Sequence, residues 1–144
     1  MVGPRPVTSS PVTPELERLE LRLDAAPDSV GRARQAVVAF AERHELAALP
    51  DVALAVTEAV TNAVVHAYRG GATGLVRVVA CALDTGLLVV VRDYGCGMQP
   101  NPGSPGAGLG LAVIGAVAGE MNIERPDAGG GTRIRIRFKP GGRD

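Results

Sequence analysis

Residues 51–70 read DVALAVTEAVTNAVVHAYRG and form the most telling stretch of the chain. Glu58 and Asn62 stand four positions apart in it, among apolar residues at helical spacing. In an α-helix, two residues at that separation lie only about 40° apart around the axis, one above the other. A carboxylate and a carboxamide placed in this way can serve a single ligand. The stretch therefore predicts a helix that carries part of a binding site.

The predicted helix has two unlike faces, so it is amphipathic. Its polar stripe faces away from Val56, Ala59, Val60, Ala63 and Ala67 and consists of Glu58, Thr61, Asn62, His66 and Arg69. A helix face that only meets water usually carries many lysine, arginine and glutamate side chains, whereas this stripe carries few charges. A lightly charged, solvated face is the alternative interpretation.

Length and composition bound the class of protein. A chain of 144 residues, 46% hydrophobic and 21% charged, fits one globular domain. No apolar run reaches the roughly 20 residues of a membrane-spanning helix, and residues 1–14 lack the apolar segment of a secretion signal. We therefore expect a cytoplasmic protein without membrane contact. The formal net charge is zero, so no general field attracts nucleic acid.

Two further counts exclude familiar chemistries. Cys81 and Cys96 have no CxxC or Cys/His spacing, so neither a zinc site nor a disulfide framework is expected. Lys139 is the only lysine, against fourteen arginines. A P-loop and a eukaryotic-type protein kinase each need a lysine that holds phosphates. A single lysine near the end of the sequence suits neither fold.

The rest of the sequence divides into short elements. Residues 1–14 are rich in proline, serine and threonine and predict a disordered leader, so we place the folded domain at 15–144. Periodicity predicts strands at 18–23, 75–83, 87–93, 121–125 and 132–138, and helices at 29–46, 51–70 and 109–119. Hairpins outnumber crossovers in this order. We therefore expect an α/β two-layer sandwich, with a mixed, mainly antiparallel sheet and its helices on one face.

The strand 87–93 ends on Asp93, which opens the motif DYGCGM. A carboxylate at a strand end can accept a hydrogen bond from the exocyclic amine of adenine. Gly95 and Gly97, which have no Cβ, would let the backbone approach a flat ring. An ordinary glycine turn after a strand is the alternative interpretation of this motif.

A second glycine set, GAGLG at 106–110, follows a glycine- and proline-rich loop and opens the third predicted helix. Free N–H groups and the dipole at a helix start favour phosphate, so the set is a candidate triphosphate cradle. A flexible loop that leads into a closely packed helix is the alternative. The prolines between 100 and 105 exclude a dinucleotide-binding fingerprint, because they forbid the helix that must begin there.

Together these features form an ordered constellation that ends with Gly131-Thr132 before the last strand. The segments EAVTNAVVHAY, VRDYGCGM, GLGLAVI and GGGTRIRIRF resemble motifs of the anti-sigma-factor serine/threonine kinases. That family belongs to the GHKL, or histidine-kinase-like, ATPases with the Bergerat fold. The resemblance covers residues 15–139 and implies ATP and Mg²⁺ as ligands.

The resemblance also implies a role for each motif. Glu58 would be the general base, and Asn62 would ligate Mg²⁺ through its amide oxygen. Asp93 would hold the adenine amine, with Thr132 completing its surroundings. The other contacts to the nucleotide would come from Gly95, Gly97, Met98, Gly106, Gly108 and Gly110.

At the level of function, the resemblance implies a homodimer that sequesters a sigma factor and phosphorylates a serine on an anti-anti-sigma protein. One departure bears on catalysis. The residues between Gly97 and Gly106 are few and uncharged, where kinases of this family carry a longer lid. Phosphoryl transfer would therefore be slow, or would take a cation for the γ-phosphate from Arg69 or from the partner. A non-catalytic, nucleotide-dependent binding module is therefore the alternative. A sensor histidine kinase domain is disfavoured, because no room remains for a helical hairpin with a phosphoacceptor.

The last predicted strand has a cationic face. Arg133, Arg135 and Arg137 alternate with apolar residues, so all three should lie on one side of the sheet. Exposure to solvent and protection of a sheet edge explain this pattern. Docking of an acidic partner is the alternative interpretation.

Overall fold

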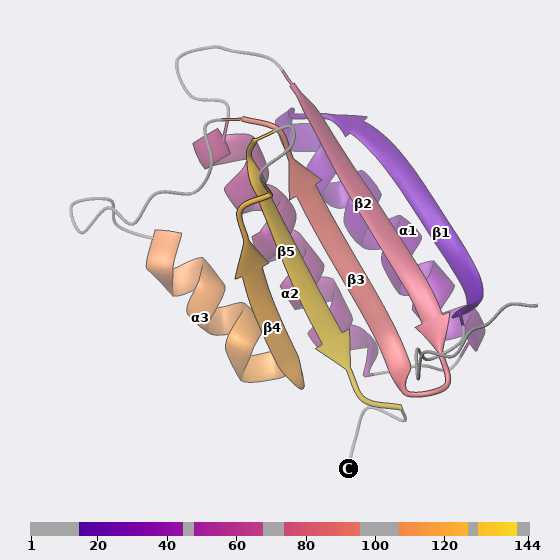
Figure 1. Ribbon diagram of the computed structural model, residues 1–144. Coiled ribbons are helices and arrows are strands. Elements are labelled where there is room, and N and C mark those ends of the chain that lie inside the picture. The colour runs from indigo at the N-terminus through magenta and orange to yellow at the C-terminus, as the bar shows by residue number, and fades with distance from the viewer. Residues whose placement is uncertain (1–14, 45–47, 68–73, 96–106, 127–129, 141–144) are drawn as a thin grey trace, which may run out of the picture.

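A computed structural model describes residues 15–44, 48–67, 74–95, 107–126 and 130–140 (Figure 1). The predicted leader 1–14 lies outside the described residues. Five strands and three helices follow one another in the predicted order. They are β1 Glu15–Asp24, α1 Pro27–His44, α2 Leu49–Asn62, a π-helical turn η1 Ala63–Ala67, β2 Leu75–Leu83, β3 Gly86–Asp93, α3 Ala107–Val117, β4 Glu120–Glu124 and β5 Thr132–Phe138.

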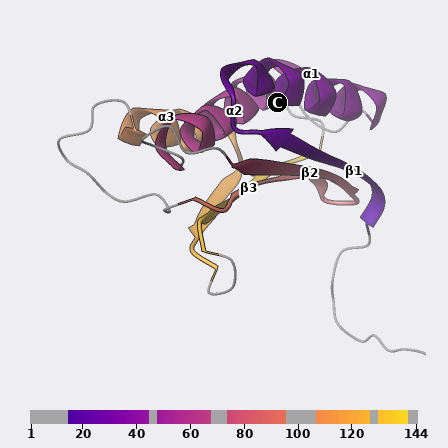
Figure 2. The ribbon, with the colours of Figure 1, turned by 90° about the horizontal axis from the view of Figure 1, so that it is seen from above.

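The strands form one sheet in the order β1-β2-β3-β5-β4. The helices lie on a single face of this sheet (Figure 2), which confirms the two-layer α/β sandwich. Each neighbouring pair of described strands is antiparallel, so the sheet is not mixed. The chain leaves β3 through α3, places β4 at the edge and then turns back, so that β5 enters between β3 and β4 in the opposite direction to both.

The core lies between the helices and the covered face of the sheet. Phe40 of α1, Leu87 of β3, Ile114 of α3 and Ile136 of β5 are its largest fully buried side chains. Each side chain of this size stabilises the fold by about 1.5 to 3 kcal/mol through burial. Four apolar residues at helical spacing in α1 are buried, namely Ala33, Val37, Phe40 and Ala41.

We call the opposite side of the sheet the outer face. In β5 the buried residues alternate with Arg133, Arg135 and Arg137, which confirms that these three share one side. The cross-strand pairs Arg77–Arg92 and Arg92–Arg133 extend this side across three strands. A second apolar cluster on the outer face comprises Val79, Cys81, Leu83, Leu88 and Val90.

Most element boundaries shift by one to three residues from the prediction, and two differences bear on the candidate site. The second helix was expected to continue regularly to Gly70, but α2 ends at Asn62 and passes into the π-helical turn. The change begins where the Ala63 N–H group bonds the carbonyl oxygens of both Ala59 and Val60. The third helix begins at Ala107, within the segment predicted as loop. None of the helices in the described ranges has the length and apolar character to cross a membrane.

Candidate nucleotide site

Three elements bring sequence-predicted residues to one end of the sandwich. Strand β3 ends at Asp93, α2 ends at Asn62, and α3 begins at Ala107. Figure 1 shows these ends on the same side of the molecule, and α2 packs directly against α3. Thr132 begins β5 beside Asp93 at this same end. The topology therefore gathers residues as far apart in the sequence as Asn62 and Thr132, which are 70 positions apart.

Asp93 is the central polar group of this end. It is only 4% exposed, and its Oδ1 accepts a hydrogen bond from the Gly95 N–H group at 3.1 Å. Burial raises the pKa of its carboxyl above the usual range for aspartate, whereas hydrogen bonds from the Gly95 and Thr132 N–H groups and the charge of Arg92 oppose this shift. A buried carboxyl of this kind can receive a donor from a ligand.

Thr132 and its preceding turn lie directly against Asp93. The two residues are cross-strand partners, and Thr132 is 1% exposed. Gly131 has a φ of 78°, and a Cβ at this position would overlap the carbonyl oxygen of Asp93. Only glycine allows this close approach. The prediction that Asp93 and Thr132 belong to one cluster agrees with this geometry.

Asn62 is more deeply placed than the sequence indicated. The amphipathic pattern assigned it to the polar stripe of the helix, but it is only 4% exposed. Its Nδ2 atom is buried and has no hydrogen-bond partner within the described part of the chain. A buried amide without a partner costs about 1 to 3 kcal/mol, which favours a ligand that satisfies it. Glu58, one turn earlier, is half-buried.

The remaining predicted site residues are divided. Gly108 and Gly110 lie at the start of α3, as predicted, and Gly95 lies beside Asp93. Gly97, Met98 and Gly106 lie outside the described residues. The structure thus describes the adenine side of the candidate site and the first turns of the candidate phosphate helix.

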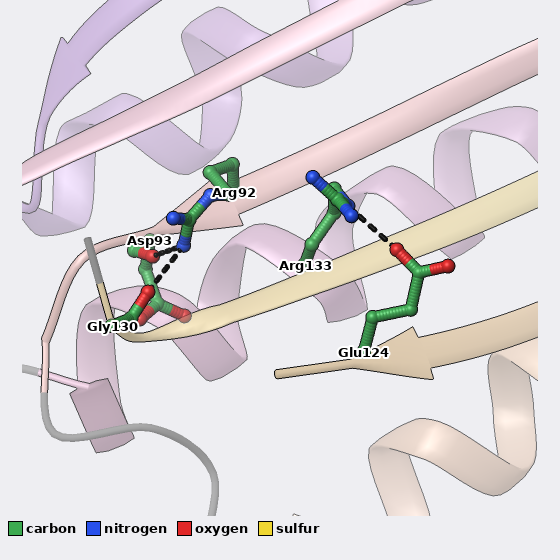
Figure 3. Close-up of polar contacts among 5 residues, drawn as sticks. All are labelled: Arg92, Asp93, Glu124, Gly130 and Arg133. Atoms are coloured by element: carbon green, nitrogen blue, oxygen red, sulfur yellow. Dashed lines mark hydrogen bonds and ion pairs between the residues drawn. The ribbon is translucent and has the colours of Figure 1, made fainter. Parts of the chain in front are cut away.

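Sequence reasoning missed Arg92. Its guanidinium Nη1 donates to the carbonyl oxygens of Asp93 and Gly130, each at 2.6 Å (Figure 3). The same guanidinium lies 4.2 Å from the centre of the Tyr94 ring. Its position directly before Asp93, and therefore on the other side of the strand, was the available signal.

The residues present fit a nucleotide with a divalent cation. Asp93 supplies a buried acceptor for an amine, the Nδ2 group of Asn62 supplies a donor without a partner among the described residues, and α3 supplies backbone N–H groups at its start. An amide oxygen and a nearby carboxylate are ligands of the kind that Mg²⁺ prefers.

Comparison with known proteins agrees with this geometry. The model of the histidine kinase-like ATPase domain family matches residues 23–138. An anti-sigma F factor from Clostridium acetobutylicum is 31% identical over 135 residues, which span 85% of this chain and 93% of the relative. An anti-sigma F factor from Pasteuria penetrans is 32% identical over 133 residues, which span 83% of this chain and 88% of that protein.

A solved structure shares the fold. The crystal structure of the RsbU and RsbW domains of a Mycobacterium tuberculosis protein superimposes with a TM-score of 0.66 at 24% sequence identity. The match covers 86% of this chain but only 32% of that chain, so the likeness concerns the fold of one part of a longer protein. By family match and by identity to its relatives, the chain belongs to the anti-sigma-factor branch of the histidine kinase-like ATPase family.

Proposed function

We propose that the chain is an ATP-binding anti-sigma regulatory factor that phosphorylates a serine on an anti-anti-sigma partner. The observation that carries the nucleotide part is the buried Asp93 carboxyl, held by the Gly95 and Thr132 N–H groups at a strand end. The regulatory part is supported by relatives that are themselves named anti-sigma F factors.

In the proposed complex, Asp93 accepts a hydrogen bond from the exocyclic amine of adenine. Gly95 and Gly97 leave room for the ring, and Met98 packs near it. The N–H groups around Gly106, Gly108 and Gly110 hold the phosphates, because the start of α3 offers free donors. Each of these roles follows from the residue type and its place in the motif.

The proposed transfer uses Glu58 and Asn62. The carboxylate of Glu58 takes the proton from the serine hydroxyl while the serine oxygen forms a bond to the γ-phosphorus, and the bond to the β-γ bridging oxygen breaks to leave ADP. Asn62 would hold Mg²⁺ through its amide oxygen, and the cation would supply positive charge to the transfer. Both side chains lie one turn apart at the end of α2.

The proposed partners are a sigma factor and an anti-anti-sigma protein, and the chain would act as a cytoplasmic homodimer without direct contact to nucleic acid. A second function has a specific observation in its favour. The residues at 98–105 include no charge, so the γ-phosphate would lack a cation from this segment. The chain would then be a binding module whose nucleotide occupancy sets its affinity for a partner.

A phosphoryl-transfer assay separates these two functions. Purified protein is incubated with Mg²⁺, γ-labelled ATP and an anti-anti-sigma protein, and label on serine is measured. We expect wild type to label the partner and Glu58→Gln to lose at least about 100-fold in rate, as is typical for loss of a general base, with unchanged affinity for ATP. Glu42→Gln, on the exposed side of α1, is the matched control and should behave as wild type.

Each outcome has a distinct meaning. Full labelling by Glu58→Gln would contradict the role of Glu58 as the base. If wild-type protein binds ATP and a sigma factor but labels no partner, the kinase function is contradicted and the nucleotide-dependent binding module is supported. Absence of ATP binding would contradict both functions.

A further inference from the structure

Arg92 is unusual among the arginines of the described residues because it is buried, at 8% exposure. It precedes Asp93 in β3, so alternation along the strand directs the two side chains to opposite faces of the sheet. Asp93 faces the candidate site, and Arg92 lies on the outer face. A buried guanidinium needs hydrogen-bond acceptors to offset the loss of water around its charge.

The acceptors of Arg92 belong to the backbone of the candidate site. One is the carbonyl oxygen of Asp93, at the end of β3, and the other is the carbonyl oxygen of Gly130, in the turn before β5. Figure 3 shows the same Nη1 atom between the two oxygens. Hydrogen bonds from a charged donor are roughly twice as strong as neutral ones. Arg92 therefore joins the end of β3 to the turn before β5, where Gly130 follows Arg92 by 38 positions in the sequence.

The neighbours of Arg92 on the outer face make different contacts. Its cross-strand partners are Arg77 and Arg133, and like charges placed directly opposite each other destabilise a sheet. Arg133 donates to Glu124 at 2.6 Å, and Arg77 donates to Glu20. Arg92 instead turns toward the backbone and stacks on Tyr94, with its guanidinium 4.2 Å from the ring centre. Backbone carbonyls of the candidate site thus accept hydrogen bonds from Arg92, whereas carboxylates accept those of its neighbours Arg77 and Arg133.

The two carbonyls that Arg92 joins lie close in the sequence to the N–H groups that hold the Asp93 carboxyl. Gly95 follows Asp93 by two residues, and Thr132 follows Gly130 by two residues. Their N–H groups are the donors to the carboxyl. Fixing the two carbonyls from the outer face therefore fixes the direction of both donors and, through them, the carboxyl.

We propose that Arg92 is a positioning residue of the nucleotide site, which from the outer face sets the Asp93 carboxyl to select a purine with a 6-amino group. This inference rests on the proposed function, because it assumes that Asp93 receives the adenine amine. It assigns the selectivity of the site in part to a residue that does not touch the nucleotide.

The test compares ATP with inosine triphosphate, which carries an oxygen in place of the 6-amino group. Dissociation constants for both are measured by calorimetry on wild type, Arg92→Met, Arg92→Lys and Arg133→Met. We expect Arg92→Met to raise the dissociation constant for ATP about tenfold, which corresponds to about 1.4 kcal/mol. The dissociation constant for inosine triphosphate should change far less. Arg92→Lys should recover part of the preference, because an ammonium group can also donate to both carbonyls.

Arg133→Met is the matched control. It removes the cross-strand partner of Arg92, an arginine that donates to the Glu124 carboxylate and not to the site backbone. It should leave both dissociation constants unchanged. An unchanged preference for ATP in folded Arg92→Met would overturn the inference, and so would an equal loss for both nucleotides, because that result indicates a merely structural role. If Arg92→Met does not fold, Arg92→Lys makes the same comparison with a smaller expected shift. Wild-type protein that binds neither nucleotide would overturn the proposed function itself, a result distinct from both.

Discussion

The pairing of β3 with β5 has a glycine of positive φ beside each of its two ends. Only one of these ends carries candidate functional residues. The ladder runs from Leu87 opposite Phe138 to Asp93 opposite Thr132. Gly86 precedes the first pair with a φ of 125°, and Gly131 precedes the last with a φ of 78°. A Cβ at Gly86 would overlap the Phe138 carbonyl oxygen, as one at Gly131 would overlap that of Asp93.

The ends differ in their side chains. Leu87 and Phe138 are buried and apolar, whereas Asp93 and Thr132 are buried and polar. Burial of apolar groups stabilises the fold, while burial of polar groups stabilises it only where hydrogen bonds replace those lost to water. The comparison shows that the tight glycine turn belongs to the strand pairing. The buried polar residues are not required by strand pairing, since the other end does without them, and they are the ones that we propose for the site.

The largest expected effects come from the two glycines. Gly86→Ala and Gly131→Ala should each lower the free energy of unfolding by about 2 to 5 kcal/mol, because a left-handed alanine and an overlap with the backbone both cost energy. Urea denaturation measures this loss. If the ends differ as proposed, Gly131→Ala also weakens ATP binding at temperatures where both variants are folded, whereas Gly86→Ala does not. Equal ATP affinity in the two variants would count against the site.

A smaller effect is expected from Asp93→Asn. The new amide keeps an oxygen for one N–H group but sets a donor against the adenine amine, so ATP affinity should fall roughly 10- to 100-fold, as for an unsatisfied buried donor. Fluorescence titration with a labelled ATP analogue measures the change. The matched variant at the other end, Leu87→Val, should lower stability by about 1 kcal/mol and leave ATP affinity intact. If Asp93→Asn binds ATP as tightly as wild type does, the adenine amine does not bind at Asp93.

The pH dependence of stability should also distinguish the ends. Burial raises the pKa of Asp93 in the folded protein, whereas in the unfolded chain an aspartate ionises near pH 4, about its ordinary value. Between these two pKa values the unfolded chain has released a proton that the folded protein keeps, so Asp93 makes the free energy of unfolding fall as pH rises through this window. Asp93→Asn should gain stability relative to wild type over the same window. Denaturation at a series of pH values above 4 tests this, and a constant difference between the two proteins would contradict it.

The smallest effect is expected at the Arg133–Glu124 pair. The two side chains are 39% and 40% exposed, so their ion pair should contribute only about 0.2 to 1 kcal/mol. Arg133→Gln should lower the melting temperature slightly, and less so in high salt. A loss of more than about 2 kcal/mol would show that this arginine, like Arg92, is part of a larger network.

Much of the fold follows from patterns in the sequence. The alternation in β5, the buried stripe of α1 and the hairpin between β2 and β3 all correspond to predicted features. These features are local or depend on periodicity alone, so the sequence contains them. The association of Asp93 with Thr132, which lie in different strands, was implied only by the family resemblance.

Other features depend on contacts between distant segments. Asn62 was placed on the polar stripe but is buried, and no helical pattern within α2 reveals that α2 packs against α3. The register of β3 and β5 decides that Gly130 lies within reach of Arg92. Neither the antiparallel insertion of β5 nor the overlap of Gly131 with Asp93 can be inferred before that register is known.

Calorimetric titration of ATP with Mg²⁺ into the folded wild-type chain decides whether a nucleotide binds at the end of β3. We predict saturable binding of one nucleotide per chain. Absence of binding heat at several temperatures, in protein that still unfolds cooperatively, would contradict a nucleotide site at the end of β3.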